Sequence, residues 1–130
     1  MEAGTVREEI RLLFDAFVEA FRTFSVESIA DLYAVPYMAV QSDGAAAVHG
    51  THESVREYFE GVLNDYRQGG CNGCRYADLC IYEMGVNSTV GTVTWELTGP
   101  ENDVLSSWQE SYHLVREEGR WRIRVSTDHA

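Results

Sequence analysis

Residues 104–128 read VLSSWQESYHLVREEGRWRIRVSTD, two runs rich in β-branched and aromatic residues on either side of the triplet EEG. Runs of this kind separated by a glycine-containing turn predict an antiparallel β-hairpin. A three-residue loop with Gly119 in the left-handed conformation pairs His113 with Ile123, which belongs to the apolar side of the last strand. This register therefore predicts that His113 and Gln109 face the core of the protein.

A loop one residue shorter or longer would exchange the two faces of this hairpin, because side chains alternate along a strand. Glu110 and Tyr112 would then point inward in place of His113. The position of the glycine favours the first register, in which the outer face carries aromatic residues and arginines: Trp108, Tyr112, Arg122 and Arg124. An exposed surface of that composition predicts a homodimer formed through the sheet face.

The residues before the hairpin divide into a helical half and a β-rich half. Apolar residues recur at three- and four-residue steps over 5–24, which predicts an amphipathic helix. Ser25 and Thr51 can each cap a further helix, a short one that Pro36 ends and a longer one that a glycine pair ends. The segment YMAVQS, then DG, then AAAVH predicts two short strands between these helices.

Two more β-rich runs, at 77–86 and 88–98, complete the pattern. Helices followed by a long antiparallel meander predict an α+β fold, and the absence of a linker or repeat predicts one domain over 1–130.

Three segments in this order resemble the SnoaL-like branch of the nuclear-transport-factor-2-like superfamily: LYAVPYMAVQSDG (32–44), HGTHESVREYF (49–59) and SYHLVREEGRWRI (111–123). The resemblance covers nearly the whole chain. It implies three N-terminal helices packed in the concave face of a curved, mostly antiparallel sheet, a cone with an internal pocket. The family contains ketosteroid isomerases, polyketide cyclases, dehydratases and non-enzymatic binding domains, usually dimeric, so the fold alone does not decide the function.

The family's ketosteroid isomerases use a tyrosine of the first helix and an aspartate of the first strand. The resemblance aligns these positions with Phe17 and Gln41, and neither residue can perform the corresponding step. His113 is then the predicted catalytic acid or base, since an imidazole titrates near neutral pH. A histidine held by a hydroxyl or carbonyl group in the sheet is the alternative.

The resemblance implies an apolar pocket with a few polar groups, and ordinary core packing is the alternative role for its aromatic residues. The residues predicted to line it are Tyr37, Gln41, Tyr58, Tyr82, Trp95 and Gln109.

All the cysteines lie in GGCNGCRYADLC, residues 69–80. The spacing of Cys71 and Cys74 is compatible with a zinc knuckle or a thiol–disulfide pair, but zinc requires a fourth, distant ligand. The turn after Cys80 pairs this residue with Trp95, which predicts that Cys80 points into the core. We therefore expect three unlinked thiols, with no metal and no cofactor.

The composition excludes several classes of function. The chain has 130 residues, a net charge of −11 and ten basic residues, all arginine, which argues against a nucleic-acid partner. No apolar run is long enough to span a membrane, and the acidic, amphipathic N-terminus does not resemble a signal peptide, so we expect a cytoplasmic protein.

The sequence thus predicts a domain that binds a small apolar organic molecule. As an enzyme, it would be a lyase, cyclase or isomerase acting by proton transfer. The alternative is a non-catalytic dimeric module for interaction or ligand sensing.

Overall fold

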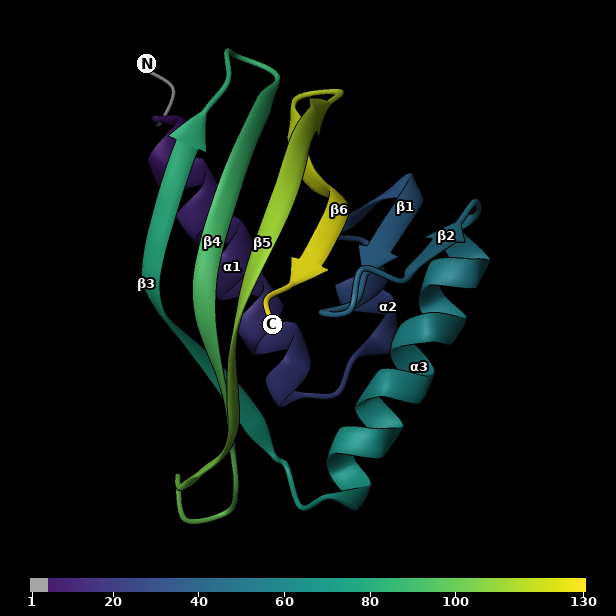
Figure 1. Ribbon diagram of the computed structural model, residues 1–130, viewed down its shortest axis with the longest axis vertical. Helices are drawn as coiled ribbons and strands as arrows, with labels where there is room; N and C mark the ends of the chain where they lie inside the picture. Colours follow the sequence, from purple (N-terminus) through teal and green to yellow (C-terminus); the bar gives the residue numbers. More distant parts are fainter. Residues whose placement is uncertain (1–4) are drawn as a thin grey trace.

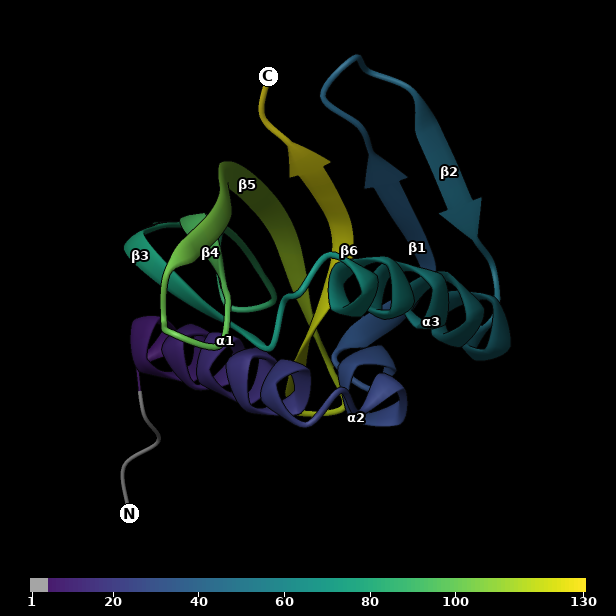
Figure 2. The same ribbon diagram turned by 90° about the horizontal axis from the view of Figure 1, so that it is seen from below.

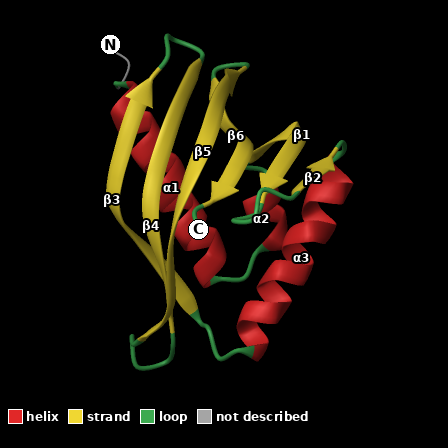
Figure 3. Cartoon of the chain, in the orientation of Figure 1, coloured by secondary structure: helices red, strands yellow, loops and turns green. Residues whose placement is uncertain are grey.

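A computed structural model of the chain describes residues 5–130 (Figure 1). Along this part of the chain the elements follow the order α1 (Val6–Arg22), α2 (Val26–Ala30), β1 (Tyr33–Val40), β2 (Ala46–His49), α3 (His52–Gln68), β3 (Gly73–Glu83), β4 (Ser88–Thr98), β5 (Val104–Glu117) and β6 (Arg120–Asp128). The predicted α+β fold class is confirmed: the helices come first and the long strands follow (Figure 3).

The strands form one sheet in the order β2-β1-β6-β5-β4-β3. Neighbouring strands are antiparallel except β1 and β6, which run parallel. The sheet curves, and α1, α2 and α3 lie on its concave side (Figure 2). This arrangement leaves one face of the sheet for the helices and the other without helical cover.

Side-chain caps begin each helix, as the sequence indicates. The hydroxyls of Thr5, Ser25 and Thr51 accept backbone N–H groups of the first turns of α1, α2 and α3. On α1 the residues at three- and four-residue steps are buried, among them Ile10 and Phe14, both fully inaccessible to solvent. The amphipathic pattern therefore has its predicted effect, which is to fix the helix against the sheet.

The second helix is shorter than predicted. It ends at Ala30, and the chain enters β1 at Tyr33, so Pro36 lies inside a strand. The reason is a tertiary contact: the backbone N–H of Ile123 on β6 donates to the carbonyl of Leu32 at 2.8 Å. Pairing with β6 outweighs the local helical pattern, and the register of the two strands shifts on either side of Pro36.

The β5–β6 hairpin shows that the favoured register was wrong. Its loop contains two residues, Glu118 and Gly119, with φ of 52° and 78°, and Glu117 pairs directly with Arg120. Two-residue loops with two positive φ angles suit the twist of a hairpin, and here the second position is glycine. The sequence did not reveal this loop because glutamate seldom adopts a positive φ.

The shorter loop exchanges the two faces of the hairpin, as the alternative register specified. Leu114 pairs with Ile123 on the inner face, and a β-bulge then shifts the register so that His113 pairs with Val125. Trp108 and Tyr112 therefore point to the concave side rather than forming an outer aromatic surface.

The β3–β4 hairpin also departs from its predicted register. The turn is longer than the predicted Asn87-Ser88 turn: Gly85 has φ of 100° and Glu83 pairs with Thr89, so that Cys80 pairs with Thr92 instead of Trp95. This register turns Cys80 to solvent. The buried thiols are Cys71 and Cys74, which the sequence had left in a loop before the strand.

Candidate ligand-binding site

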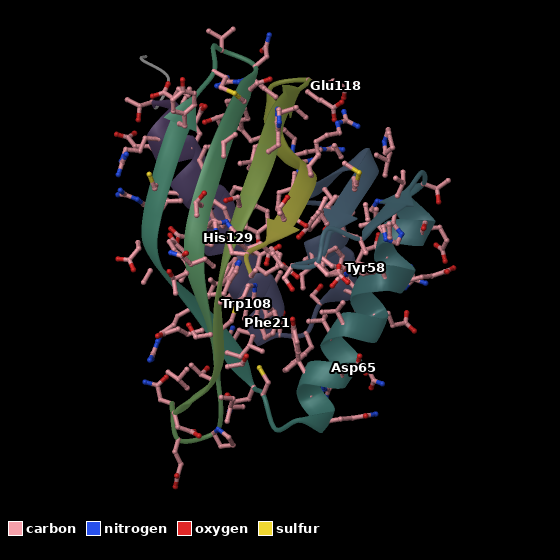
Figure 4. The ribbon with its side chains drawn as sticks, in the orientation of Figure 1. Phe21, Tyr58, Asp65, Trp108, Glu118 and His129 are labelled. Atoms are coloured by element: carbon pink, nitrogen blue, oxygen red, sulfur yellow. The ribbon has the colours of Figure 1, made fainter. Side chains whose placement is uncertain are left out.

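A cavity of about 360 Å³ lies between the concave face of the sheet and α3. Its volume falls within the range of sites for small organic molecules. Ten of the residues that line it are aromatic: Phe17, Phe21, Tyr33, Tyr37, Tyr58, Phe59, Tyr66, Trp95, Trp108 and Tyr112. In Figure 4 the labelled side chains of Phe21, Tyr58, Trp108 and His129 gather in the space between β5 and α3.

The lining residues that are exposed to solvent mark the mouth of this cavity. They are Gln41 and Ser42 at the end of β1, Ser106 on β5, and His129 after β6. His129 is held there by two contacts: its Nε2 lies 2.8 Å from the hydroxyl of Ser111, and its backbone N–H donates to the carbonyl of Gln109 at 3.0 Å. A ligand would enter past polar groups and reach an aromatic interior.

Glu110 is the acidic group of the cavity wall on β5. The indole N–H of Trp108 donates to Glu110 Oε1 at 2.9 Å. Burial raises the pKa of Glu110 to about 7, although the hydrogen bonds from Trp108 and Tyr112 favour its charged form. A carboxyl group with a pKa near the working pH can both donate and accept a proton, as general acid–base chemistry requires.

Asp128 lies directly opposite Glu110 in the β5–β6 ladder and lines the same cavity. Its negative charge adds to the effect of burial on the pKa of Glu110. Two carboxyl groups side by side resist being ionised together, and such pairs are common at functional sites.

Tyr112 connects Glu110 to the aromatic interior. The indole N–H of Trp95 donates to the Tyr112 hydroxyl at 2.6 Å. Since that oxygen accepts from Trp95, its own proton is free to be donated to Glu110, in agreement with the influence of Tyr112 on the pKa of Glu110. The tyrosine side chain is nearly inaccessible, and its ring packs edge-on against Phe14 with centroids 5.2 Å apart.

Tyr37 forms the wall contributed by β1. Its hydroxyl is 2.5 Å from the Ser126 hydroxyl, and burial raises the pKa of Tyr37. The ring stacks on His49, with centroids 5.9 Å apart, and the Nδ1 of that histidine is 2.8 Å from the Ser54 hydroxyl. His49 thus ties the end of β2 to α3.

The predicted pocket residues divide into two groups. Tyr37, Gln41, Tyr58 and Trp95 line the cavity. His113, Gln109 and Tyr82 do not: the first two lie on the opposite face of β5, and Tyr82 is 70% exposed near the end of β3. The prediction of His113 inside the pocket was wrong because it depended on the three-residue loop.

The residues missed in the favoured reading of the sequence are Glu110, Tyr112, Trp108 and Asp128. The alternative register of the β5–β6 hairpin, with its shorter or longer loop, would have placed Glu110 and Tyr112 inside. Asp128 could not be found from the pattern alone, since the β-bulge after Ile123 reverses which residues of β6 face inward.

Among residues 5–130, three side chains of types that can bind a metal ion come together at one place, on the surface formed by α2 and α3. Ligand atoms of Glu27, Asp31 and His52 lie within 4.8 Å of one another, and all three side chains are exposed. His52 Nε2 is 3.2 Å from Glu27 Oε1, which is the geometry of an ordinary surface ion pair. At the buried thiols, Cys71 Sγ donates to the carbonyl of Gly73 at 3.2 Å.

The curved sheet, the helices in its concave face and the cavity between them define a cone of the cystatin-like, NTF2-like class. The chain belongs to the family described as NTF2-like protein (DUF6841), whose model matches residues 7–130. The predicted superfamily is confirmed, whereas its SnoaL-like branch stays a prediction. No curated protein matches the sequence.

Solved structures agree on the fold. A cystatin-like protein of unknown function from Nostoc punctiforme superposes with a TM-score of 0.78 at 15% identity, covering 99% of this chain and 94% of that one. An NTF2-like protein of unknown function from Shewanella oneidensis gives 0.77 at 13%, covering 97% and 100%. An NTF2-like protein with a cystatin-like fold from Novosphingobium aromaticivorans gives 0.76 at 13%, covering 95% and 80%. Identities this low show a shared fold and nothing about function.

Within residues 5–130, none of the helices combines the length and the apolar character that crossing a membrane requires.

Proposed function

We propose that this chain is a SnoaL-like domain that binds a small, largely apolar organic molecule in its cavity, where Glu110 exchanges a proton with it. The observation that carries the proposal is a half-buried carboxyl group with a raised pKa in an aromatic cavity of ligand size. Burying such a group without a use is costly, so active sites are where perturbed carboxyl groups concentrate.

The chemistry that fits is proton transfer. In its ionised form Glu110 can remove a proton from a carbon of the ligand, and in its protonated form it can return that proton to another atom. Return to a different carbon gives an isomerase, and departure of a group from the neighbouring carbon gives a lyase. Asp128 supports this role because it keeps the pKa of Glu110 high, and Tyr112 supports it by hydrogen bonding to the carboxylate.

The alternative function, a non-catalytic interaction module that binds its partner through the outer face of the sheet, is less well supported. The cavity is of ligand size, and Trp108 and Tyr112, which would have formed an outer aromatic patch, contribute to its lining.

We also propose that the protein is a homodimer formed through the outer sheet face, where half-buried Val90 and Val115 lie beside His113. Light scattering on a size-exclusion column tests it, with Val115→Arg expected to yield monomers.

Native mass spectrometry of the purified protein tests the pocket, followed by the same sample denatured. We expect an organic mass bound to the native chain and released on denaturation. Glu110→Gln should lose any turnover of the identified compound. A chain that carries no organic mass and does not bind a fluorescent apolar probe such as anilinonaphthalene sulfonate would contradict the proposal.

A further inference from the structure

The charged groups of the cavity are of one sign. Glu110 and Asp128 lie in its wall, and none of the ten arginines lines it, although all ten belong to the described part of the chain. His129, at the mouth, is the one lining residue that can carry a positive charge. An anionic ligand would therefore meet two carboxyl groups and no fixed cation inside.

The uncharged part of the cavity lining also favours a cationic ligand. Ten of the lining residues are aromatic, and the faces of aromatic rings carry partial negative charge. Tyr58 of α3, Trp108 of β5 and Tyr37 of β1 all line the cavity, so aromatic rings reach it from three elements. Aromatic rings gathered around one space can attract an ammonium group.

We propose that the preferred ligand of this cavity is an organic cation, a small apolar molecule with a protonated or quaternary nitrogen that lies against the Glu110–Asp128 pair. The inference rests on the proposed function and specifies its ligand class. Two adjacent, half-buried carboxyl groups disfavour each other's ionised form, and a nearby positive charge favours it. Without a ligand, a proton bound to the carboxyl pair provides this positive charge. In the complex the charged nitrogen of the ligand replaces that proton.

A metal ion fits the cavity less well than an organic cation. Calcium and magnesium require about six oxygen ligands arranged around one point. Here the carboxyl pair is surrounded by rings: Glu110 accepts the indole N–H of Trp108, and Tyr66 packs on Trp108 with centroids 6.4 Å apart. An apolar body with one positive end satisfies both parts of the lining.

Binding of the cation is coupled to loss of a proton. The titratable side chains that share the cavity with Glu110 are Tyr33 and Tyr37 from β1, Tyr58 and Tyr66 from α3, Cys74 from β3, Tyr112 from β5, Asp128 from β6, and His129. The tyrosines and Cys74 are neutral near pH 7, because burial raises the pKa of each. Burial raises the pKa of Glu110 to about 7, so we expect the proton released on binding to come from this carboxyl group, which leaves Glu110 ionised and ready to act as a base.

The test compares three compounds with one carbon skeleton: phenylbutylamine, phenylbutanol and phenylbutyrate. Isothermal titration at about pH 6 should show the amine binding about tenfold or more tightly than the alcohol, and the carboxylate weakest. Titrations in two buffers of different ionisation enthalpy should show that the amine releases a proton and that the alcohol releases none.

Glu110→Gln should lower the affinity for the amine about tenfold and abolish the proton release, while leaving the alcohol unchanged. Asp128→Asn provides the same test if the first variant does not fold. The matched control is Glu118→Gln, which removes the same charge at the far end of the hairpin (Figure 4).

Each result has a distinct meaning. If the alcohol binds as tightly as the amine, the cation inference is overturned and the pocket stands. If none of the compounds binds, both proposals are overturned. A preference for the amine that persists in Glu110→Gln and Asp128→Asn also overturns the inference, since the net charge of −11 would then account for it.

Discussion

Glu110 and Asp128 face each other across the β5–β6 ladder, so two carboxyl groups share the wall of one aromatic cavity. Like charges directly opposite in a sheet destabilise it. The fold tolerates the pair because Glu110 can hold a proton that the unfolded chain would release. This relationship makes the stability of the protein depend on pH in a direction that can be predicted.

Replacing Glu110 by glutamine should remove that dependence. The pKa of Glu110 is raised from 4.5 to about 7 in the folded chain, so the folded state binds more protons than the unfolded state between these values. Its contribution to stability is therefore fully present below about pH 4.5 and is lost as the pH rises through about 7. Each pKa unit corresponds to about 1.4 kcal/mol, so the whole loss is on the order of 3 kcal/mol.

Urea unfolding at about pH 5 and pH 8 measures the effect. The wild type should lose stability relative to Glu110→Gln between these pH values, whereas Glu118→Gln should follow the wild type. Parallel pH profiles for the wild type and Glu110→Gln would show that Glu110 titrates normally in the folded protein.

Local chemistry predicted much of the fold. The caps at Ser25 and Thr51 require only a hydroxyl before a helical pattern, and the strand Ser88–Thr98 follows from its β-rich composition. The end of α2 at Ala30 could not be predicted in this way, because it depends on the contact of Leu32 with a strand far along the chain.

The candidate site depended on a single turn. Whether Glu110 or His113 faces inward is decided by one residue of loop length, and sequence pattern placed the glycine correctly without fixing the loop. The loop length depends on the positive φ of Glu118, which the sequence pattern does not reveal. It arises because the pairing of the flanking strands outweighs the unfavourable backbone of one residue.

Glu118→Asn should therefore stabilise the protein. A left-handed conformation costs most residues about 1–2 kcal/mol, whereas asparagine adopts it readily, so a gain of about 1 kcal/mol is expected. The midpoint of urea unfolding measures this gain. Glu101→Asn makes the same chemical change in another exposed loop, at a residue without a positive φ, and should change stability little. An equal gain in both variants would mean that the loss of negative charge, and not the turn, is responsible.

Tyr112→Phe should destabilise the protein although it removes one atom. The Tyr112 hydroxyl is the acceptor for the buried indole N–H of Trp95, at 2.6 Å. Leaving a buried donor unsatisfied costs about 1–3 kcal/mol. The free energy of unfolding of the variant provides the comparison, and Tyr82→Phe, at a side chain that is 70% exposed, should change it little. If the two variants were equally stable, Trp95 would have to find another acceptor or a water molecule.

The three thiols should react at two different rates. Cys80 is exposed, whereas Cys71 and Cys74 are buried, and burial raises the pKa of the Cys74 thiol to about 12. Because the thiolate is the reactive form, Ellman's reagent should label one cysteine rapidly in the folded protein and all three in urea. Cys80→Ser should abolish the rapid phase.

This measurement also separates the two explanations for the protection of Cys71 and Cys74. Burial alone predicts rates that a chelator leaves unchanged, because the thiols become accessible only when the fold opens. A zinc ion held by the C-x-x-C pair predicts that the chelator releases both thiols at once. Serine substitutions would not separate them, since a serine hydroxyl in either buried position costs stability with or without a metal. We expect the chelator to have no effect, and rapid labelling of all three cysteines after chelation would show that these residues bind a metal.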